Sequence, residues 1–415
     1  MIMVAFISAV MSSIAVCRSL VVKSESECFA NLWHKGILSE YDIYLLEDYG
    51  ILAFQGSEKE VNKKLAFYSA YSCEGKLDAS IGSPDSSLGP YVLADSDNFL
   101  KSLKNQFAGE AVECLSSDHR IRRPEEAASE NHIIANQVVI DTLPSKGVTA
   151  NIDVKDIGKR ISDENGSGSI AALTGNAAVE AAFIKNHLGS HLYTADSKKT
   201  FLINEWEYLI EGKLSDEDNY QGCRKKIFIA RNILNLASLY KDSDKMAAII
   251  EISELITPGP AAVVTQTIIA ECWAAAEAEE DLKRLTDYGR VPLIKGPGDW
   301  VISLHSVINS DKVEEKLSEE ARKLLSDNEE LIDSKAESLS HIKKEFSEGQ
   351  SYEDYLLIMI FAMNDKVRLL RIMDIVQINM KCRHYEDFNM EEYYIGADIA
   401  IEANGRAYEA EGTYR

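Results

Sequence analysis

The sequence predicts an α+β protein that is mostly helical, with a long N-terminal helix and a small antiparallel sheet. No proline interrupts residues 1–52, and apolar residues recur at helical spacings through much of 177–390. Near the C-terminus apolar residues occupy every second position: Ile395, Ala397, Ile399 and Ile401. Asn404-Gly405 follows them, and this dipeptide favours the two-residue turns that join antiparallel strands. We therefore expect a C-terminal β-hairpin.

The first seventeen residues, Met1–Cys17, carry no charged side chain, and Arg18 ends the run. This length is slightly below the roughly 20 residues that span a bilayer. A secretory signal peptide would begin with basic residues, and none precedes this run. The uncharged, apolar character of this segment favours either a membrane anchor or the buried first helix of a soluble protein.

The helical pattern continues beyond the apolar run as far as Glu47. Its apolar stripe is predicted from residues spaced at helical intervals: Leu20, Val21, Ser24, Cys28, Leu32, Ile37 and Leu38. A long helix that is apolar at its N-terminal end and amphipathic beyond has the design of a pilin-like subunit.

Residues 57–176 predict a mixed, loop-rich region. Turn residues crowd 57–95, whereas Asn98–Leu115 predicts a short amphipathic helix. The β-branched run NQVVIDTL (136–143) predicts a strand. Residues 145–176 contain ENGSGS and predict a linker or an exposed loop.

Residues 177–390 predict a helical region. The first predicted helices are Ala177–His187, Ile203–Ile210, Cys223–Tyr240 and Lys245–Ile256. Thr257-Pro258 predicts an N-cap followed by proline at the first position of a long helix that ends near Asp287. The highly charged Asp311–Glu348 predicts one solvated helix.

The late apolar stretch Ser351–Cys382 predicts two helices that separate near Asn364-Asp365. Ser351 and Asp354 have the spacing of a capping box. The apolar run Tyr355–Met363 is too short for a membrane span, so we expect a core helix there.

The charge balance argues against a nucleic-acid ligand. Asp and Glu outnumber Lys and Arg by 67 to 44, which gives a net charge of −23 and repels phosphate backbones. Seven cysteines occur at wide spacings without a CxxC pair, which excludes a zinc ribbon and a dense disulfide framework.

Catalytic motifs are absent from the sequence. His187 and His191 have the i, i+4 spacing of metal ligands, but Gly189 lies between them and no Glu follows His187 directly. The segment NGSGSIAALTG lacks a complete phosphate loop, and no GxSxG is present. Lys295 lies in the turn-rich GRVPLIKGPGDWVISL, where we expect a structural turn anchored by Trp300. We assign no catalytic, cofactor-binding or metal-ligating residue and expect no enzyme activity and no cofactor.

Six motifs stand out in order along the chain. They are ILSEYDIYLLEDYGILAF (Ile37–Phe54), EWEYLIEGKLSDEDN (Glu205–Asn219), RNILNLASLYKD (Arg231–Asp242), VPLIKGPGDW (Val291–Trp300), SYEDYLLIM (Ser351–Met359) and RIMDIVQINM (Arg371–Met380). In this order and spacing the chain resembles a family of TadE/TadG-like proteins of Gram-positive anaerobes. The genes of that family typically lie beside those of tight-adherence (Tad/Flp) type IV pili.

The resemblance implies a single-pass protein of the cell membrane with an extracytoplasmic body and pilin-like or Tad assembly partners. Compared with the family, the membrane helix is shorter here and its basic N-terminal flank is missing, so Met1–Cys17 resembles the outer part of an anchor whose start lies upstream. Arg18, Lys23 and Lys35 follow the run and by themselves would favour a cytoplasmic body. The extracytoplasmic expectation rests on the resemblance.

Four segments and three functions summarise the expectations. The segments are an anchor or pilin-like helix (1–56), a loop-rich region (57–176), a helical region (177–390) and a β-hairpin (391–415). The favoured function is a membrane-anchored minor pilin-like or pilus-assembly component. The alternatives are an extracellular hydrolase that uses separated carboxylates and a cytosolic helical scaffold.

Overall fold

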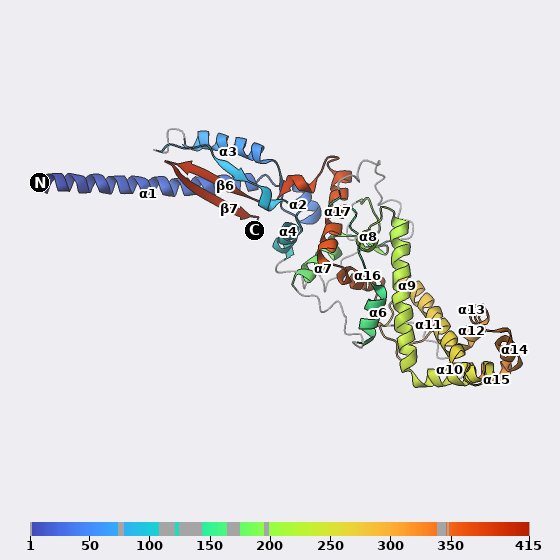
Figure 1. The fold of residues 1–415 in the computed structure, drawn as a ribbon. Coiled ribbons are helices and arrows are strands. Elements are labelled where there is room, and N and C mark those ends of the chain that lie inside the picture. The colour runs from blue at the N-terminus through green and yellow to red at the C-terminus, as the bar shows by residue number, and fades with distance from the viewer. Residues whose placement is uncertain are drawn as a thin grey trace.

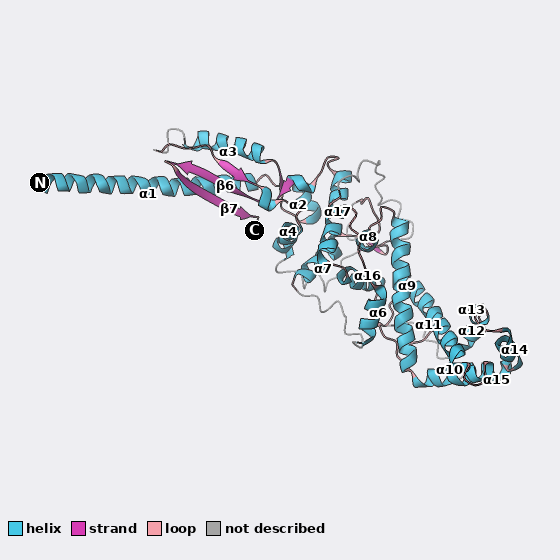
Figure 2. Cartoon of the chain, in the orientation of Figure 1, coloured by secondary structure: helices cyan, strands magenta, loops and turns pink. Residues whose placement is uncertain are grey.

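The fold is α+β and mostly helical, as the sequence predicts. The computed structural model describes residues 2–73, 79–107, 121–123, 143–163, 175–194, 199–337, 346 and 348–414. The molecule is elongated: helix α1 (Ile2–Leu38) projects from one end, and a group of helices from α10 to α15 forms the other end (Figure 1). Between them lies a helical body, and Figure 2 shows that the strands concentrate near α1.

The long N-terminal helix is confirmed, but it ends before the predicted limit at Glu47. A second helix, α2 (Ile43–Tyr49), begins after a break. The Asp42 carboxylate caps α2 by accepting hydrogen bonds from two backbone N–H groups, at 2.9 Å each. Gly50 ends it in the left-handed conformation with φ of 66°. The cap signals at Asp42 and Gly50 therefore divide the helical pattern.

The predicted apolar stripe of α1 is wrong apart from Ile37, which is buried, and Leu38, which is partly buried against the same core. The buried side chains are Val22, Ser26, Ala30, Trp33, His34 and Ile37. They recur every three or four residues and form one helical face. The predicted members Leu20, Val21, Ser24, Cys28 and Leu32 are exposed.

The buried face of α1 packs on a three-stranded antiparallel sheet in the order β2-β6-β7. Its strands are β2 (Asp85–Ser87), β6 (Gly396–Ala403) and β7 (Arg406–Thr413). The predicted hairpin is confirmed: Ala403 pairs with Arg406 at the tip, and φ is 52° at Asn404 and 75° at Gly405. The hairpin runs alongside α1 (Figure 1).

The prediction that 57–95 is loop-rich is wrong for its first part, which forms α3 (Glu58–Cys73). Ser57 caps this helix: its hydroxyl donates to the Glu60 carboxylate at 3.0 Å and accepts from the Glu60 N–H at 3.4 Å. Val61 and Leu65 of α3 join the core formed by α1 and the sheet. The short elements nearby are the 3₁₀ helices η1 (Gly89–Tyr91) and η4 (Met390–Glu392) and the antiparallel strands β1 (Phe54–Gln55) and β5 (Tyr393–Tyr394).

The central body holds the largest hydrophobic core. Its helices in the described ranges are α4 (Ser96–Phe107), α6 (Val154–Asp163), α7 (Asn176–His187), α8 (Glu205–Glu211), α9 (Asp216–Lys241), α16 (Tyr352–Ala362) and α17 (Asp365–Arg383). Strands β3 (Ile121–Arg122) and β4 (Tyr193–Thr194) pair beside them. The predicted capping box at Ser351 and the split before Asp365 are confirmed, and α16 is a core helix.

One prediction for this body is wrong, and another falls on residues outside the described ranges. The linker expected over 145–176 contains α6, which packs on α9 with Gly158 against Ile233. A side chain at 158 would come within 3.2 Å of Ile233, so glycine permits the close approach. The strand predicted over 136–143 lies outside the described residues except for Leu143.

The far end of the molecule has its own hydrophobic core. Its helices are α10 (Ser243–Ile256), α11 (Ala262–Thr286), α12 (Leu304–Ile308), α13 (Asp311–Glu314), α14 (Glu319–Asp327) and α15 (Glu329–Glu337). The single helix predicted over Asp311–Glu348 is wrong, since the described part is divided between α13, α14 and α15. Ser318 caps α14 by accepting the Ala321 N–H at 3.2 Å.

The predicted start of the long helix at Thr257-Pro258 is also wrong. Thr257 ends α10, because its N–H donates to the Ser253 carbonyl at 2.8 Å. Gly259 then turns the chain with φ of 84°, and α11 begins at Ala262. The helix ends at Thr286, close to the predicted limit.

Candidate functional site

The most exposed apolar surface of the described chain is the N-terminal part of α1. Every residue from Ile2 to Val21 is exposed on the helix surface. The large apolar side chains of the uncharged run Ile2–Cys17 are between 42% and 89% exposed. Of the helices in the described ranges, α1 alone is long and apolar enough to cross a membrane. We call Ile2–Cys17 the anchor segment.

The covered part of α1 begins about one helical turn after the end of the anchor segment. Val22 is its first buried residue, and the hairpin holds the helix farther along through His34. The Nε2 atom of His34 lies 3.0 Å from the Ala397 carbonyl and 3.3 Å from the Gly412 carbonyl. Both partners are acceptors, so this nitrogen carries the proton and donates. The contact fixes α1 to both strands of the hairpin.

A pair of buried glutamates on α8 is the chemistry that a carboxylate hydrolase would require. Glu205 accepts the Gly189 N–H and the Asn379 amide, at 2.7 Å each. Glu207 accepts the His191 N–H and the Tyr352 hydroxyl, at 3.0 Å each. Burial raises the pKa of each carboxyl to about 7.

One member of this pair, Glu205, lines a cavity of about 30 Å³, with Asp48, Arg123 and Arg383 among the other lining residues. That volume holds about one water molecule, whereas small-molecule sites typically measure roughly 300–1,000 Å³. The carboxylates instead fix the backbone of the loop that follows α7. Their geometry supports a structural role.

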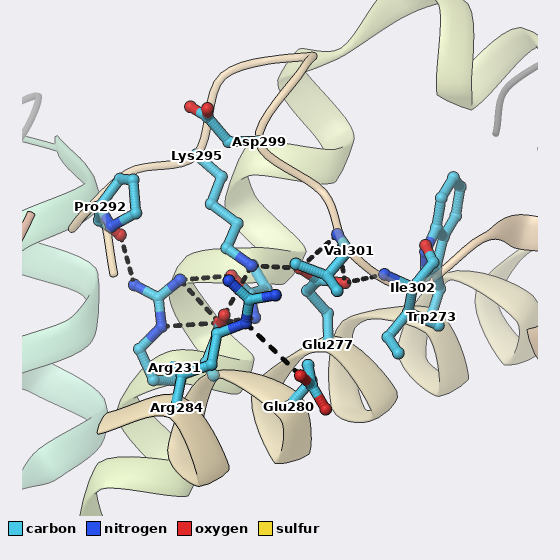
Figure 3. A network of polar contacts seen from close by, with 12 residues as sticks. Arg231, Trp273, Glu277, Glu280, Arg284, Pro292, Lys295, Asp299, Val301 and Ile302 are labelled. Atoms are coloured by element: carbon cyan, nitrogen blue, oxygen red, sulfur yellow. Dashed lines mark hydrogen bonds and ion pairs between the residues drawn. The ribbon is translucent and has the colours of Figure 1, made fainter. Parts of the chain in front are cut away.

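A second buried polar cluster joins α9, α11 and the turn Val291–Trp300 (Figure 3). The Arg231 guanidinium donates to Asp281 through Nε at 3.0 Å and pairs with it through Nη2 at 2.9 Å. Arg231 Nη1 donates to the carbonyls of Pro292 and Leu293 at 2.9 Å each. The arginine therefore fixes the turn to α9 and α11 together. We call Arg231, Glu277, Asp281 and Lys295 the turn clamp.

Lys295, the residue singled out in the turn sequence, belongs to this clamp. Its ammonium pairs with Glu277 and, at 2.6 Å, with Asp281, and all three side chains are fully buried. Glu277 also accepts the N–H groups of Val301 at 3.0 Å and Ile302 at 2.8 Å. Burial alone would raise the pKa of Asp281, but Arg231 and Lys295 outweigh it and hold that pKa below its ordinary value. Lys295 is thus positioned as a structural cation.

Trp300 anchors the turn as expected. It is buried, and its ring lies 5.1 Å from that of Trp273. The Trp273 indole donates to the Ile302 carbonyl at 2.8 Å. Apolar packing and the turn clamp therefore hold the same segment.

The two histidines with metal-ligand spacing face different surroundings. The His187 ring packs against Phe183 with centroids 4.9 Å apart, whereas the His191 ring stacks on Tyr220 at 3.7 Å. Helix α7 ends at His187, so His191 lies in the following loop. In the part of the chain that the structure describes, no group of three or more His, Cys, Asp or Glu is placed to hold a metal ion.

The buried charges were missed by the sequence reasoning, although the motifs contain most of them. Glu205, Glu207, Arg231 and Lys295 all lie in the six motifs. A signal was present for Arg231, which is four residues after Ile227 and three before Leu234, on the buried stripe of α9. A charge on an apolar stripe indicates a buried ion pair.

Comparison with known proteins gives one match. The model of a family of unknown function (DUF5702) matches residues 126–405. No curated protein and no solved structure matches the chain. Since the matched range covers more than half of its 415 residues, the protein belongs to this family of unknown function (DUF5702).

Proposed function

We propose that the protein is anchored in a membrane by the anchor segment and that its acidic body acts outside the cytoplasm by protein–protein interaction. One observation carries the anchor: the uncharged run and the uncovered run of α1 nearly coincide. The charges begin at Arg18, and protein packing begins at Val22, one helical turn later. Charge pattern and packing are different properties, and the boundaries that they give along the helix lie within about one turn of each other.

The free energy of insertion supports this proposal. Burying a large apolar side chain contributes about 1.5–3 kcal/mol, and the partly exposed side chains of the anchor segment together would contribute on the order of 10–20 kcal/mol. The residues are Ile2, Met3, Val4, Phe6, Ile7, Val10, Met11, Ile14 and Val16. Apart from those of its end turns, the backbone groups of a helix form hydrogen bonds within the helix, as hydrocarbon requires.

The more specific proposal is a minor pilin-like or pilus-assembly component. It is supported by the resemblance of the six motifs to TadE/TadG-like proteins and by the two-part design of α1. The family description names no pilus, so this part of the proposal rests on the resemblance. The anchor segment would contact the apolar helices of pilin-like partners within the bilayer.

A non-enzymatic role is part of the same proposal. The hydrolase alternative needs two acidic groups in an accessible cleft, whereas the cavity beside Glu205 measures about 30 Å³ and Glu207 is not among its described lining residues. The cytosolic scaffold alternative needs cover for α1, and the described residues leave Ile2–Val21 exposed.

Cell fractionation tests the anchor. The full chain should be found in the membrane fraction, and a variant with residues 2–17 deleted should be soluble with unchanged circular dichroism of the body. A full chain that is soluble would refute the anchor. Protease treatment of intact cells then tests the side: digestion of the body supports the extracytoplasmic proposal, and protection contradicts it.

Photocrosslinking in native cells tests the pilus role. A photoreactive amino acid at Phe6, which is 68% exposed in the anchor segment, should form a product with a pilin-like protein. The same label at the exposed Lys312, at the far end of the body, is the control. An anchored chain whose position 6 links to lipid but to no pilin-like protein would contradict the pilus role alone.

A further inference from the structure

A groove of about 670 Å³ lies between α1 and the tip of the β6–β7 hairpin. Its α1 side is apolar at Met11, Ile14 and Ala15. Arg18 of α1 and Arg406 of β7 also line it, and both residues are exposed. We call this space the anchor groove. It joins an apolar wall to two guanidinium groups.

The described residues that line the anchor groove carry a charge opposite to that of the whole protein. The chain has a net charge of −23, yet the described residues that line this groove include two arginines and no acidic side chain. The larger groove of about 1,000 Å³ beside α3 differs, since Glu40, Glu60 and Glu392 line it together with lysines. Arginine is always charged and its planar fork matches the geometry of a phosphate.

The position of the anchor groove along α1 is set by the hairpin. At the base, His34 contacts Ala397 and Gly412, and at the tip Ala403 pairs with Arg406. A strand rises about 3.3 Å per residue and a helix 1.5 Å, so the eight residues of β6 reach back over roughly four turns of α1. The tip thereby reaches the level of Arg18, where the uncharged run ends.

We propose that the anchor groove holds an anionic phospholipid. Its phosphate is bound by Arg18 and Arg406, and an acyl chain lies along Met11 and Ile14. The inference rests on the proposed membrane anchor, because insertion up to Arg18 brings the groove to the level of the headgroups. Tyr408, which also lines the groove, is a residue type enriched at this interface. The hairpin then acts as a lipid clasp that fixes the depth of α1.

The test uses the full chain in vesicles that contain photoreactive phosphatidylglycerol or photoreactive phosphatidylcholine in otherwise equal composition. Crosslinks are mapped to residues 2–18 by peptide mass. A basic group near the membrane surface favours anionic lipid by about fivefold, so we expect phosphatidylglycerol to crosslink at least about fivefold more. The variant Arg18→Gln/Arg406→Gln should bring the ratio close to one.

Matched controls separate the two proposals. Lys23→Gln removes a basic group from the same helix outside the groove, where the lysine ammonium lies 3.8 Å from Glu27, and should keep the preference. Equal crosslinking of both lipids to residues 2–18 would overturn the clasp and leave the anchor intact, as would a preference that survives in the double variant. An absence of crosslinks with either lipid would overturn the anchor itself.

Discussion

Replacing Lys295 by methionine tests the assignment of the turn clamp as a structural unit. Methionine is unbranched, apolar and of similar length, so the change removes the charge without opening a large cavity. Glu277 would keep the N–H groups of Val301 and Ile302, and Asp281 would keep Arg231. Both carboxylates would lose their shared ammonium inside the protein.

The expected loss of stability is about 3 kcal/mol. Removal of one partner from a buried ion pair typically costs about 3–5 kcal/mol, and the lower end applies because both carboxylates keep other donors. Lys312→Met is the matched control, because Lys312 of α13 also pairs with an acidic residue of α11. Its ammonium lies 2.8 Å from Glu279 of α11, but the two side chains are 56% and 57% exposed. An exposed pair of this kind contributes about 0–1 kcal/mol.

Equilibrium unfolding by urea, with the full chain in mild detergent, measures both variants. Fluorescence is suited to the purpose because Trp273 and Trp300 pack next to the clamp. We expect Lys295→Met to lower the free energy of unfolding by at least about 2 kcal/mol more than Lys312→Met. Equal losses in the two variants would refute a structural role for Lys295.

Three further predictions concern the pH dependence, the hairpin and the side of the membrane. Burial raises the pKa of Glu205 from 4.5 to about 7, so its contribution to stability is fully present below about pH 4.5 and is lost as the pH rises through 7. In urea unfolding, Glu205→Gln should reduce this loss of stability between pH 5 and 8 by on the order of 3 kcal/mol. An unchanged pH dependence of the variant would contradict the burial argument. Gly405→Ala places a side chain on a residue with φ of 75° and should lower the free energy of unfolding by about 1 kcal/mol. Gly298→Ala is the control, because Gly298 has open space around it and no positive φ, and it should lower the stability less. Thermal unfolding compares the two variants, and equal losses of stability would contradict the turn conformation. Cys28 is exposed just beyond the anchor, so an impermeant thiol reagent should label it on intact cells and not in Cys28→Ser; labelling only after lysis would place the body inside the cell.

The sequence predicted elements well where local signals agreed with one another. Asn404-Gly405 followed a period-two pattern, and Ser351 with Asp354 formed a capping box, so both elements are confirmed. The helix start predicted at Thr257-Pro258 is wrong because α10 continues to Ile256, so that Thr257 is the C-cap of α10. Local propensity does not tell which of two adjacent helices a capping residue serves.

The buried face of α1 was not predictable from its own residues. The side chains Leu20, Cys28 and Leu32 are at least as apolar as Ser26 and His34, yet the latter two are buried. The hairpin, more than 360 residues away in the sequence, selects that face through its contacts with His34. Only the packed fold carries this information.

The buried charges of the candidate site show the same limit. In the sequence, Glu277 and Asp281 of α11 stand four positions apart, which is a pattern typical of the solvated face of a helix. Arg231, the partner of Asp281, lies 50 residues away from it in the sequence. Lys295, the partner of both, lies 18 residues from Glu277 and 14 from Asp281, so no local pattern predicts these pairings. The uncharged run of the anchor segment, by contrast, was visible from composition alone.

The depth of α1 in a bilayer tests the central claim most directly. A fluorophore attached at position 7 through Ile7→Cys, or at Cys28, can be quenched in vesicles by nitroxide lipids or by aqueous iodide. The anchor predicts that the label at position 7 responds to the lipid quencher and is protected from iodide, and that the label at position 28 does the reverse. Equal quenching of both labels by iodide would show that residues 2–17 remain in water and would contradict the membrane anchor.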